Sequence, residues 1–241
     1  MPIAACGVLV SACVSMRDPG PVAPSAQVSD ALAAYALSFP ERNLSHVSQS
    51  KLNYGKNGTL DITTRLESTA QPGVWKLKTV KIANTPSEER IEELTFLGLI
   101  PLSSSSFYLS STWLSHVRIE YARTDSLTLR GDWKNMPAGK KIGFTADIRQ
   151  RPDGLPAYRE TIVEECEVEE SLPARRLHPK LKGNYKTLRC ARKKTVVFPW
   201  ESKAREYKSE PVLYFLEQYG FAAAATQAEF LGVDGDGDGE R

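Results

Sequence analysis

The sequence predicts a mainly β protein, built as an antiparallel β-sandwich or a barrel-like domain with one or two short helices and one disulfide bond. Strand patterns recur at intervals of about ten residues with Gly, Pro and Asn between them, which is typical of antiparallel all-β folds. Cys166 and Cys190 lie in two of these patterns and are the only cysteines outside the N-terminal segment. In an oxidising compartment they are the predicted disulfide pair.

The first predicted element is a short helix. Ser29 or Asp30 can serve as its N-cap, strong helix formers follow as far as Leu37, and Pro40 ends the segment. Residues 87–94 are ambiguous. They fit one or two helical turns capped by Ser87, and they fit an exposed strand equally well.

The strands are predicted from alternating apolar and polar residues and from β-branched and aromatic runs. In chain order they cover residues 59–66, 74–83, 106–113, 116–123, 126–133, 141–148, 158–170, 184–190 and 195–198. Residues 211–221 are dense in aromatics and are predicted to close the fold as a strand or hairpin. The large aromatic side chains are expected in the core rather than in a ligand groove. They are Trp75, Trp113, Trp133, Trp200, Tyr214, Phe215, Tyr219 and Phe221.

The two cysteine-bearing strands have opposite charge. Ile162, Cys166 and Val168 share one parity of the first strand, while glutamates dominate the other. The second strand carries Cys190 and is basic, so we expect the two to pair with their charged rows meeting on the solvent side. In an oxidising compartment the disulfide would close a loop of about 25 residues and contribute roughly 3–4 kcal/mol. The alternative is two unpaired buried thiols in a reducing compartment.

The N-terminus is an uncharged run of small and apolar residues, and the first charge is Arg17. A run of about a dozen residues is too short to span a bilayer and is typical of a signal peptide. Its end, Val10-Ser11-Ala12-Cys13, resembles the lipobox of bacterial lipoproteins. The resemblance implies acylation of Cys13, removal of residues 1–12, and an outer-membrane lipoprotein that faces the periplasm. No Lys or Arg precedes the apolar run, so a merely apolar cytosolic N-terminus is the alternative.

The remaining chain divides by composition. Residues 13–28 are rich in Pro, Ser, Ala and Gly and are predicted to be a flexible tether. Residues 29–231 are predicted to form the β-rich domain, which could consist of two small β units with a boundary near 135–155. Residues 232–241 are an acidic Gly/Asp tail that we expect to be disordered.

Motifs for catalysis and metal binding are missing from the sequence. His46, His116 and His178 are isolated, without zinc-binding spacing. There is no Gly-x-Ser-x-Gly elbow, phosphate-binding glycine loop or Ser-x-x-Lys signature. We therefore predict no cofactor and no catalytic residue. The net charge of +2 also argues against nucleic-acid binding through overall charge.

Two charged segments are candidate sites. The first is a basic run that could bind an anionic partner, such as lipopolysaccharide phosphates, or could neutralise the glutamates of residues 160–170. It consists of Arg175, Arg176, Lys180, Lys182, Lys186, Arg189, Arg192, Lys193 and Lys194. The second, with Asp234, Asp236 and Asp238, resembles the opening of a calcium loop. No twelfth-position Glu follows it in this sequence, so we expect a solvated tail without bound metal.

Together these features predict a lipid-anchored periplasmic binding or inhibitor protein, of the accessory or immunity type. Its partners would be the membrane, through the lipid, and another envelope or toxin protein, but not nucleic acid. One alternative is a cell-wall hydrolase, which requires a histidine beside carboxylates in a cleft. Another is a carrier of a lipid or glycan fragment, which requires an apolar cavity.

Overall fold

A computed structural model describes residues 22–35, 37–40, 44, 46–53, 59–83, 87–110 and 117–224. Within these residues, one α-helix precedes a single antiparallel sheet of twelve strands. The elements are α1 (Ala26–Ala33), β1 (His46–Asn53), β2 (Thr59–Ser68), β3 (Val74–Ala83), β4 (Ser87–Phe96), β5 (Ile100–Ser110), β6 (Val117–Arg130), β7 (Lys141–Arg151), β8 (Tyr158–Pro173), the short 3-10 helix η2 (Ala174–Arg176), β9 (Asn184–Val197), β10 (Arg205–Ser209), β11 (Val212–Leu216) and β12 (Phe221–Ala224).

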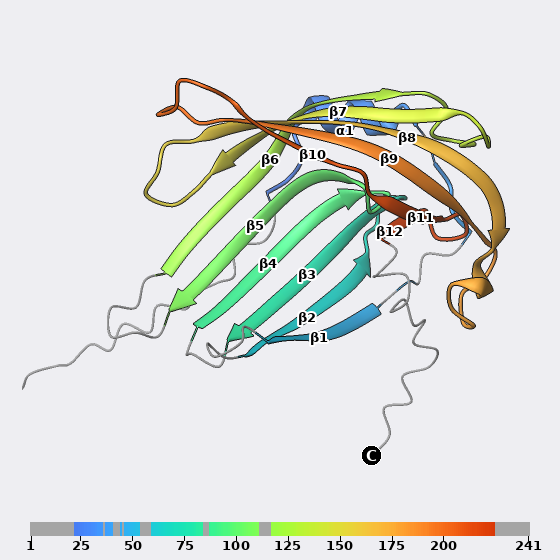
Figure 1. Cartoon of the computed structure of the whole chain (residues 1–241), viewed down its shortest axis with the longest axis horizontal. Coiled ribbons are helices and arrows are strands. Elements are labelled where there is room, and N and C mark those ends of the chain that lie inside the picture. The colour runs from blue at the N-terminus through green and yellow to red at the C-terminus, as the bar shows by residue number, and fades with distance from the viewer. Residues whose placement is uncertain are drawn as a thin grey trace, which may run out of the picture.

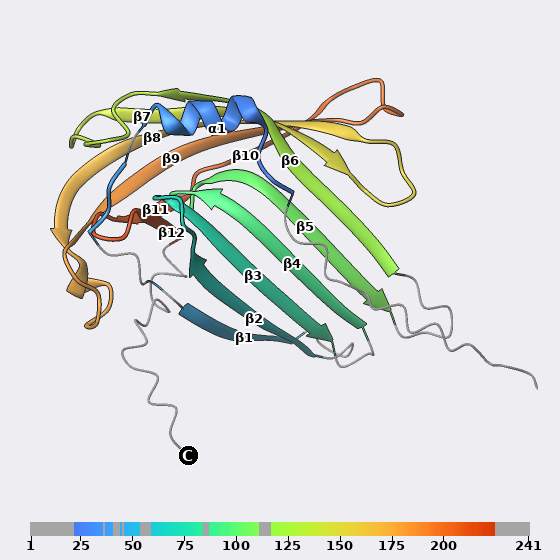
Figure 2. The same ribbon diagram turned by 180° about the vertical axis from the view of Figure 1, so that it is seen from behind.

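From β1 to β9, strands that follow one another in sequence are neighbours in the sheet. β11 and β10 both pair with β9, along its first and second halves, and β12 pairs with β11. The sheet curls into a half-barrel in which β7, β8 and β9 arch over β2 to β5 (Figure 1). The view from behind shows α1 against the arched part of the sheet (Figure 2). The predicted fold class is therefore confirmed in its barrel-like form.

Three irregularities interrupt the ladder of this sheet. They lie at Leu94/Thr95 between β4 and β5, at Thr124/Ser126 between β6 and β7, and at Val168/Ser171 between β8 and β9. A bulge bends its strand and increases the local twist, so these positions help a large sheet to curl. The second bulge also lies beside the candidate site described below.

Several predicted elements have different limits in the structure. The helix begins earlier than predicted, because Ser25 is its N-cap and accepts a hydrogen bond from the Val28 backbone N–H at 3.3 Å. The ambiguous segment at residue 87 is a strand, β4. The two predicted strands at 116–123 and 126–133 largely merge into the single long strand β6. Two polar strands, β1 and β10, had no apolar alternation that would predict them.

The core consists of two apolar clusters. The larger lies between α1 and the inner faces of β7, β8 and β9, and it includes Phe144 and Trp133. The smaller surrounds Trp75, whose Nε1–H donates to the Gly220 carbonyl at 2.9 Å. Most of the predicted core aromatics are buried or partly buried, but Trp200 is 52% exposed. Trp113 lies outside the described residues.

The tight turn between β4 and β5 contacts β12, the strand at one end of the sheet. Leu97 accepts a hydrogen bond at its carbonyl from the Ala222 backbone N–H at 2.7 Å. The neighbouring Gly98 has a φ of +70°, and a Cβ there would lie 2.5 Å from the Ala222 carbonyl oxygen. Only glycine permits both that conformation and that approach. The closing hairpin predicted at residues 211–221 is thus β11 and β12, which pack against this turn.

The Cys166–Cys190 disulfide is present. The two residues are direct partners across β8 and β9, and both are buried. Ile162 and Val168 are buried on the same side, which confirms the predicted face of this strand. No α-helix in the described part of the chain has the length and apolar character needed to cross a membrane.

Candidate anion-binding pocket

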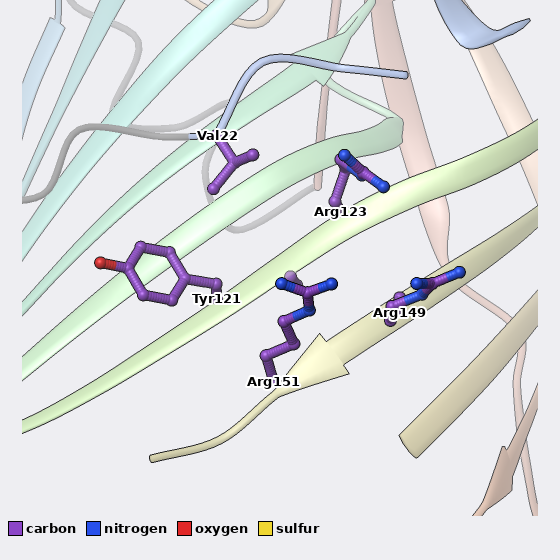
Figure 3. Close-up of a pocket in the computed structure, with 6 residues that line it drawn as sticks. Val22, Tyr121, Arg123, Arg149 and Arg151 are labelled. Carbon is purple, nitrogen blue, oxygen red and sulfur yellow. The ribbon is translucent and has the colours of Figure 1, made fainter. Parts of the chain in front are cut away.

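A small pocket lies over β6 and β7, next to the segment that leads into α1 (Figure 3). Its volume is about 220 Å³, and it is lined by Val22, Tyr121, Ala122, Arg123, Arg149 and Arg151. Pockets for drug-sized ligands usually measure roughly 300–1,000 Å³. This pocket therefore suits a single chemical group better than a whole organic ligand.

The register between neighbouring strands places arginines directly opposite one another at this pocket. Arg123 on β6 lies directly opposite Arg149 on β7, and Arg149 lies directly opposite Arg159 on β8. Direct partners in an antiparallel ladder point to the same face, so three guanidinium groups form one row across three strands. One step along the ladder, Arg151 lies opposite Tyr121. Like charges directly opposite one another are destabilising, so a row of this kind requires a compensating negative charge.

Asp125 supplies part of that compensation. It lies at the Thr124/Ser126 bulge, and its Oδ1 accepts from Nη2 and Nε of Arg123 at 3.0 and 3.2 Å. Its Oδ2 lies 2.8 Å from Nη2 of Arg149. Neither Arg151 nor Arg159 has an ion pair within the part of the chain that the structure describes. Among the described residues, the three arginines that line the pocket thus have one ion-paired carboxylate, Asp125, which contacts two of them.

The buried hydroxyl of Ser103 is a further polar group beside the arginine row. Ser103 on β5 is the direct partner of Arg123 across the β5–β6 ladder and is buried. Its Oγ has no hydrogen-bond partner among the described residues. A buried hydroxyl without a partner costs free energy, and functional positions are one place where such groups occur.

The basic run predicted as a candidate patch does not form a single cationic surface. Arg175, Arg176, Lys180 and Lys182 lie on η2 and the loop after it, and the other five lie on β9, whose successive side chains face opposite ways. All five β9 cations are in ion pairs with glutamates. The pairs are Lys186–Glu217, Arg189–Glu169, Arg192–Glu164, Lys193–Glu206 and Lys194–Glu160.

Two of these pairs lie on the inner face of the sheet, not on the solvent side where the charged rows were predicted to meet. The side chains of Glu164 and Glu160 are 0% and 7% exposed. Both glutamates have the same parity in β8 as the buried Cys166. Their burial was not predicted, because glutamates occur at both parities along this strand. Loss of solvation raises the pKa of the Glu164 carboxyl, although the Arg192 guanidinium beside it acts in the opposite direction.

Glu164 also lies close to the disulfide, with Oε1 3.6 Å from Sγ of Cys166. The ligand atoms of Glu164, Cys166 and Cys190 lie within 4.8 Å of one another, a grouping that can hold a metal ion. Cysteine binds metal as a thiolate, however, and both sulfurs here are joined in the disulfide. This cluster is therefore structural in the oxidised protein.

Of the three histidines, the structure describes the side chain of His178 alone. His178 lies in the loop before β9, where its Nδ1 accepts the Lys180 backbone N–H at 3.3 Å. His46 is in β1 and pairs with Leu66 through the backbone, but its side chain lies outside the described residues. His116, Cys13 and the aspartates at 234, 236 and 238 are likewise outside them.

Sequence patterns did not single out the arginines of the pocket. Arg149 and Arg151 occupy alternate positions just past the predicted strand at 141–148, which is the one signal available. Their meeting with Arg123 depends on the register between β6 and β7. Comparisons with known protein families, with curated proteins and with solved structures gave no match to this chain.

Proposed function

We propose that this chain is a non-catalytic binding protein of the bacterial cell envelope, and that its ligand carries an anionic group held in the arginine pocket. The aligned row of Arg123, Arg149 and Arg159 is the observation that carries this proposal. Guanidinium groups keep their charge at all physiological pH values and bind carboxylates and phosphates through two parallel hydrogen bonds. A row in charge excess beside a small pocket is therefore suited to recognising an anion.

The same residues argue for binding over hydrolysis. Arginine does not exchange its proton near neutral pH, so it cannot act as a general acid or base. Among the described residues, Asp125 is the carboxylate paired with the row, and both of its oxygens are engaged by Arg123 and Arg149. A hydrolase would need a free acid–base pair within reach of its substrate.

The proposal places the protein at the outer membrane, facing the periplasm, with a lipid on Cys13. The lipobox-like Val10-Ser11-Ala12-Cys13 supports this placement, and the buried disulfide is compatible with an oxidising compartment. The Cys13→Ser substitution should move the protein from the membrane fraction to the soluble fraction of bacterial cells. Cys6→Ser is the matched control, because residue 6 is discarded with the signal. Unchanged partitioning of Cys13→Ser would exclude the anchor.

Binding at the pocket is tested with two double variants. Arg149→Gln/Arg151→Gln removes two cations from the pocket, and Arg175→Gln/Arg176→Gln removes two exposed cations from the basic loop. On a panel of immobilised carboxylated, phosphorylated and neutral ligands, the first variant should lose binding by about tenfold or more, since a charge-assisted hydrogen bond contributes about 1.5–3 kcal/mol. The second should resemble the wild type. A larger loss for the loop variant would assign binding to the basic run instead.

A further inference from the structure

We infer that the arginine pocket accepts a phosphate group in particular, an inference that rests on the proposed anionic ligand. The first reason is charge. Three arginines line the pocket, Arg123, Arg149 and Arg151, and among the described residues one carboxylate, Asp125, forms ion pairs with two of them. A carboxylate ligand brings one negative charge, whereas a phosphate monoester carries about −1.5 to −2 at neutral pH. The dianion neutralises more of the excess.

The second reason is the supply of hydrogen-bond donors. Each guanidinium has five N–H donors, and Asp125 occupies only some of those on Arg123 and Arg149. The fork of Arg151 is uncommitted among the described residues, whereas the hydroxyl of Tyr121, at the position directly opposite it, points away from the arginines (Figure 3). Donors arriving from β6 and β7 at different angles suit the three terminal oxygens of a phosphate ester better than the two coplanar oxygens of a carboxylate.

The third reason is the shape of the pocket. Val22 and the ring of Tyr121 contribute an apolar lining beside the guanidinium groups (Figure 3). A wall of this kind excludes water from one side of the bound group and can contact a carbon skeleton. With a volume of about 220 Å³, the pocket has room for a phosphate and the first atoms of the group that it esterifies, but not for an acyl chain.

The position of the pocket suggests two sources for such a phosphate. Val22 is nine residues after Cys13 in sequence. A fully extended chain advances at most about 3.3–3.6 Å per residue, so a lipid on Cys13 would hold the pocket within about 30 Å of its own attachment point. Phosphate esters are then available from lipid headgroups at the bilayer surface or from soluble molecules in the surrounding compartment.

The experiment uses the full-length chain, purified without acylation. Calorimetric titrations with glycerol 3-phosphate and with lactate compare a phosphomonoester with a carboxylate of similar size. Flotation with phosphatidylcholine vesicles, with or without phosphatidic acid, tests the lipid source. We expect glycerol 3-phosphate to bind at least about tenfold more tightly than lactate, and Arg151→Gln to remove about tenfold of that affinity. Arg176→Gln, on η2, is the matched control and should leave it unchanged.

The outcomes distinguish phosphate binding from anion binding in general. Equal affinity for lactate and glycerol 3-phosphate, both weakened by Arg151→Gln, would overturn the phosphate assignment and leave anion binding at the pocket intact. Weakening by Arg176→Gln equal to that by Arg151→Gln, or no binding of either anion and no flotation, would overturn both. Flotation that requires phosphatidic acid and Arg151 identifies a lipid headgroup, and binding confined to the soluble ester identifies a soluble phosphate. Each variant is first shown to melt like the wild type.

Discussion

Two strand pairs of this sheet have the same chemistry and different surroundings. In β3–β4, the ion pairs Lys76–Glu92 and Lys81–Glu89 measure 2.8 and 3.0 Å, and their side chains are 21–35% exposed. In β8–β9, Arg192 and Lys194 pair with glutamates that are almost fully buried. Both pairs are acidic strands beside basic ones in the sequence. The contribution of an ion pair to stability therefore depends on how deeply the curled sheet buries its carboxylate, and not on the order of charges in the sequence.

The physical reason is solvation. An exposed pair exchanges contacts with water for contacts with its partner, and its net contribution is about 0–1 kcal/mol. A buried carboxylate has already lost its water, so removal of its partner leaves the full cost of burying a charge. β8–β9 therefore depends on its pairs in a way that β3–β4 does not. The disulfide makes the contrast larger, because it joins β8 to β9 covalently.

The largest expected effect comes from the disulfide. The Cys166→Ala/Cys190→Ala variant should unfold with a free energy about 3–4 kcal/mol below that of the wild type, because the unfolded chain is no longer constrained by a loop of this length. Chemical denaturation of both proteins measures the difference. Addition of a dithiol reductant should destabilise the wild type and leave the variant unchanged. Equal stability of wild type and variant would contradict the contrast between the two strand pairs.

The next effect concerns the buried ion pair. Arg192→Met removes the partner of Glu164, and we expect the free energy of unfolding at neutral pH to fall by about 1–3 kcal/mol. Adding Glu164→Gln to this variant should restore part of the loss, because residue 164 then no longer carries an unpaired buried charge. Denaturation of the two single variants and the double variant forms a cycle that isolates the coupling between the residues. A coupling near zero would show that burial does not govern this pair.

Glu164 should also leave a signature in the pH dependence. Burial raises its pKa in the folded state, so the folded protein binds more protons than the unfolded chain above the ordinary glutamate pKa. Its contribution therefore lowers the free energy of unfolding as pH rises from that value towards the raised one. Denaturation of wild type and Glu164→Gln between about pH 4 and pH 7 should show that the variant lacks this decline. Parallel pH profiles would contradict the assignment.

The smallest effect is expected in β3–β4, which serves as the control. Lys81→Met and Glu89→Gln, alone and together, should show a coupling of only about 0.2–1 kcal/mol, and added salt should reduce it. If this cycle matches the Glu164–Arg192 cycle, the comparison between the two strand pairs fails. The same denaturation measurements serve for both pairs.

The sequence predicted much of the local structure because strand periodicity is local. The alternation at residues 59–66 and 74–83 predicted β2 and β3, and the parity of Ile162, Cys166 and Val168 predicted the buried face of β8. It did not predict β1 or β10, whose residues are polar and, for β10, exposed on both faces. It also gave two strands where β6 is one, because the bulge at Asp125 shifts the alternation without ending the pairing.

By itself, the sequence determined the β class and the lack of any familiar catalytic motif, and it made Cys166 and Cys190 the candidates for a disulfide. Only the tertiary structure decided which charges are buried and which arginines meet. Side-chain parity is a property of one strand, whereas register and curl depend on every strand between the partners. Arg123 and Arg159 are far apart in the chain, and the β6–β7 and β7–β8 ladders place them on either side of Arg149. The candidate site arises from that alignment, which no single segment contains.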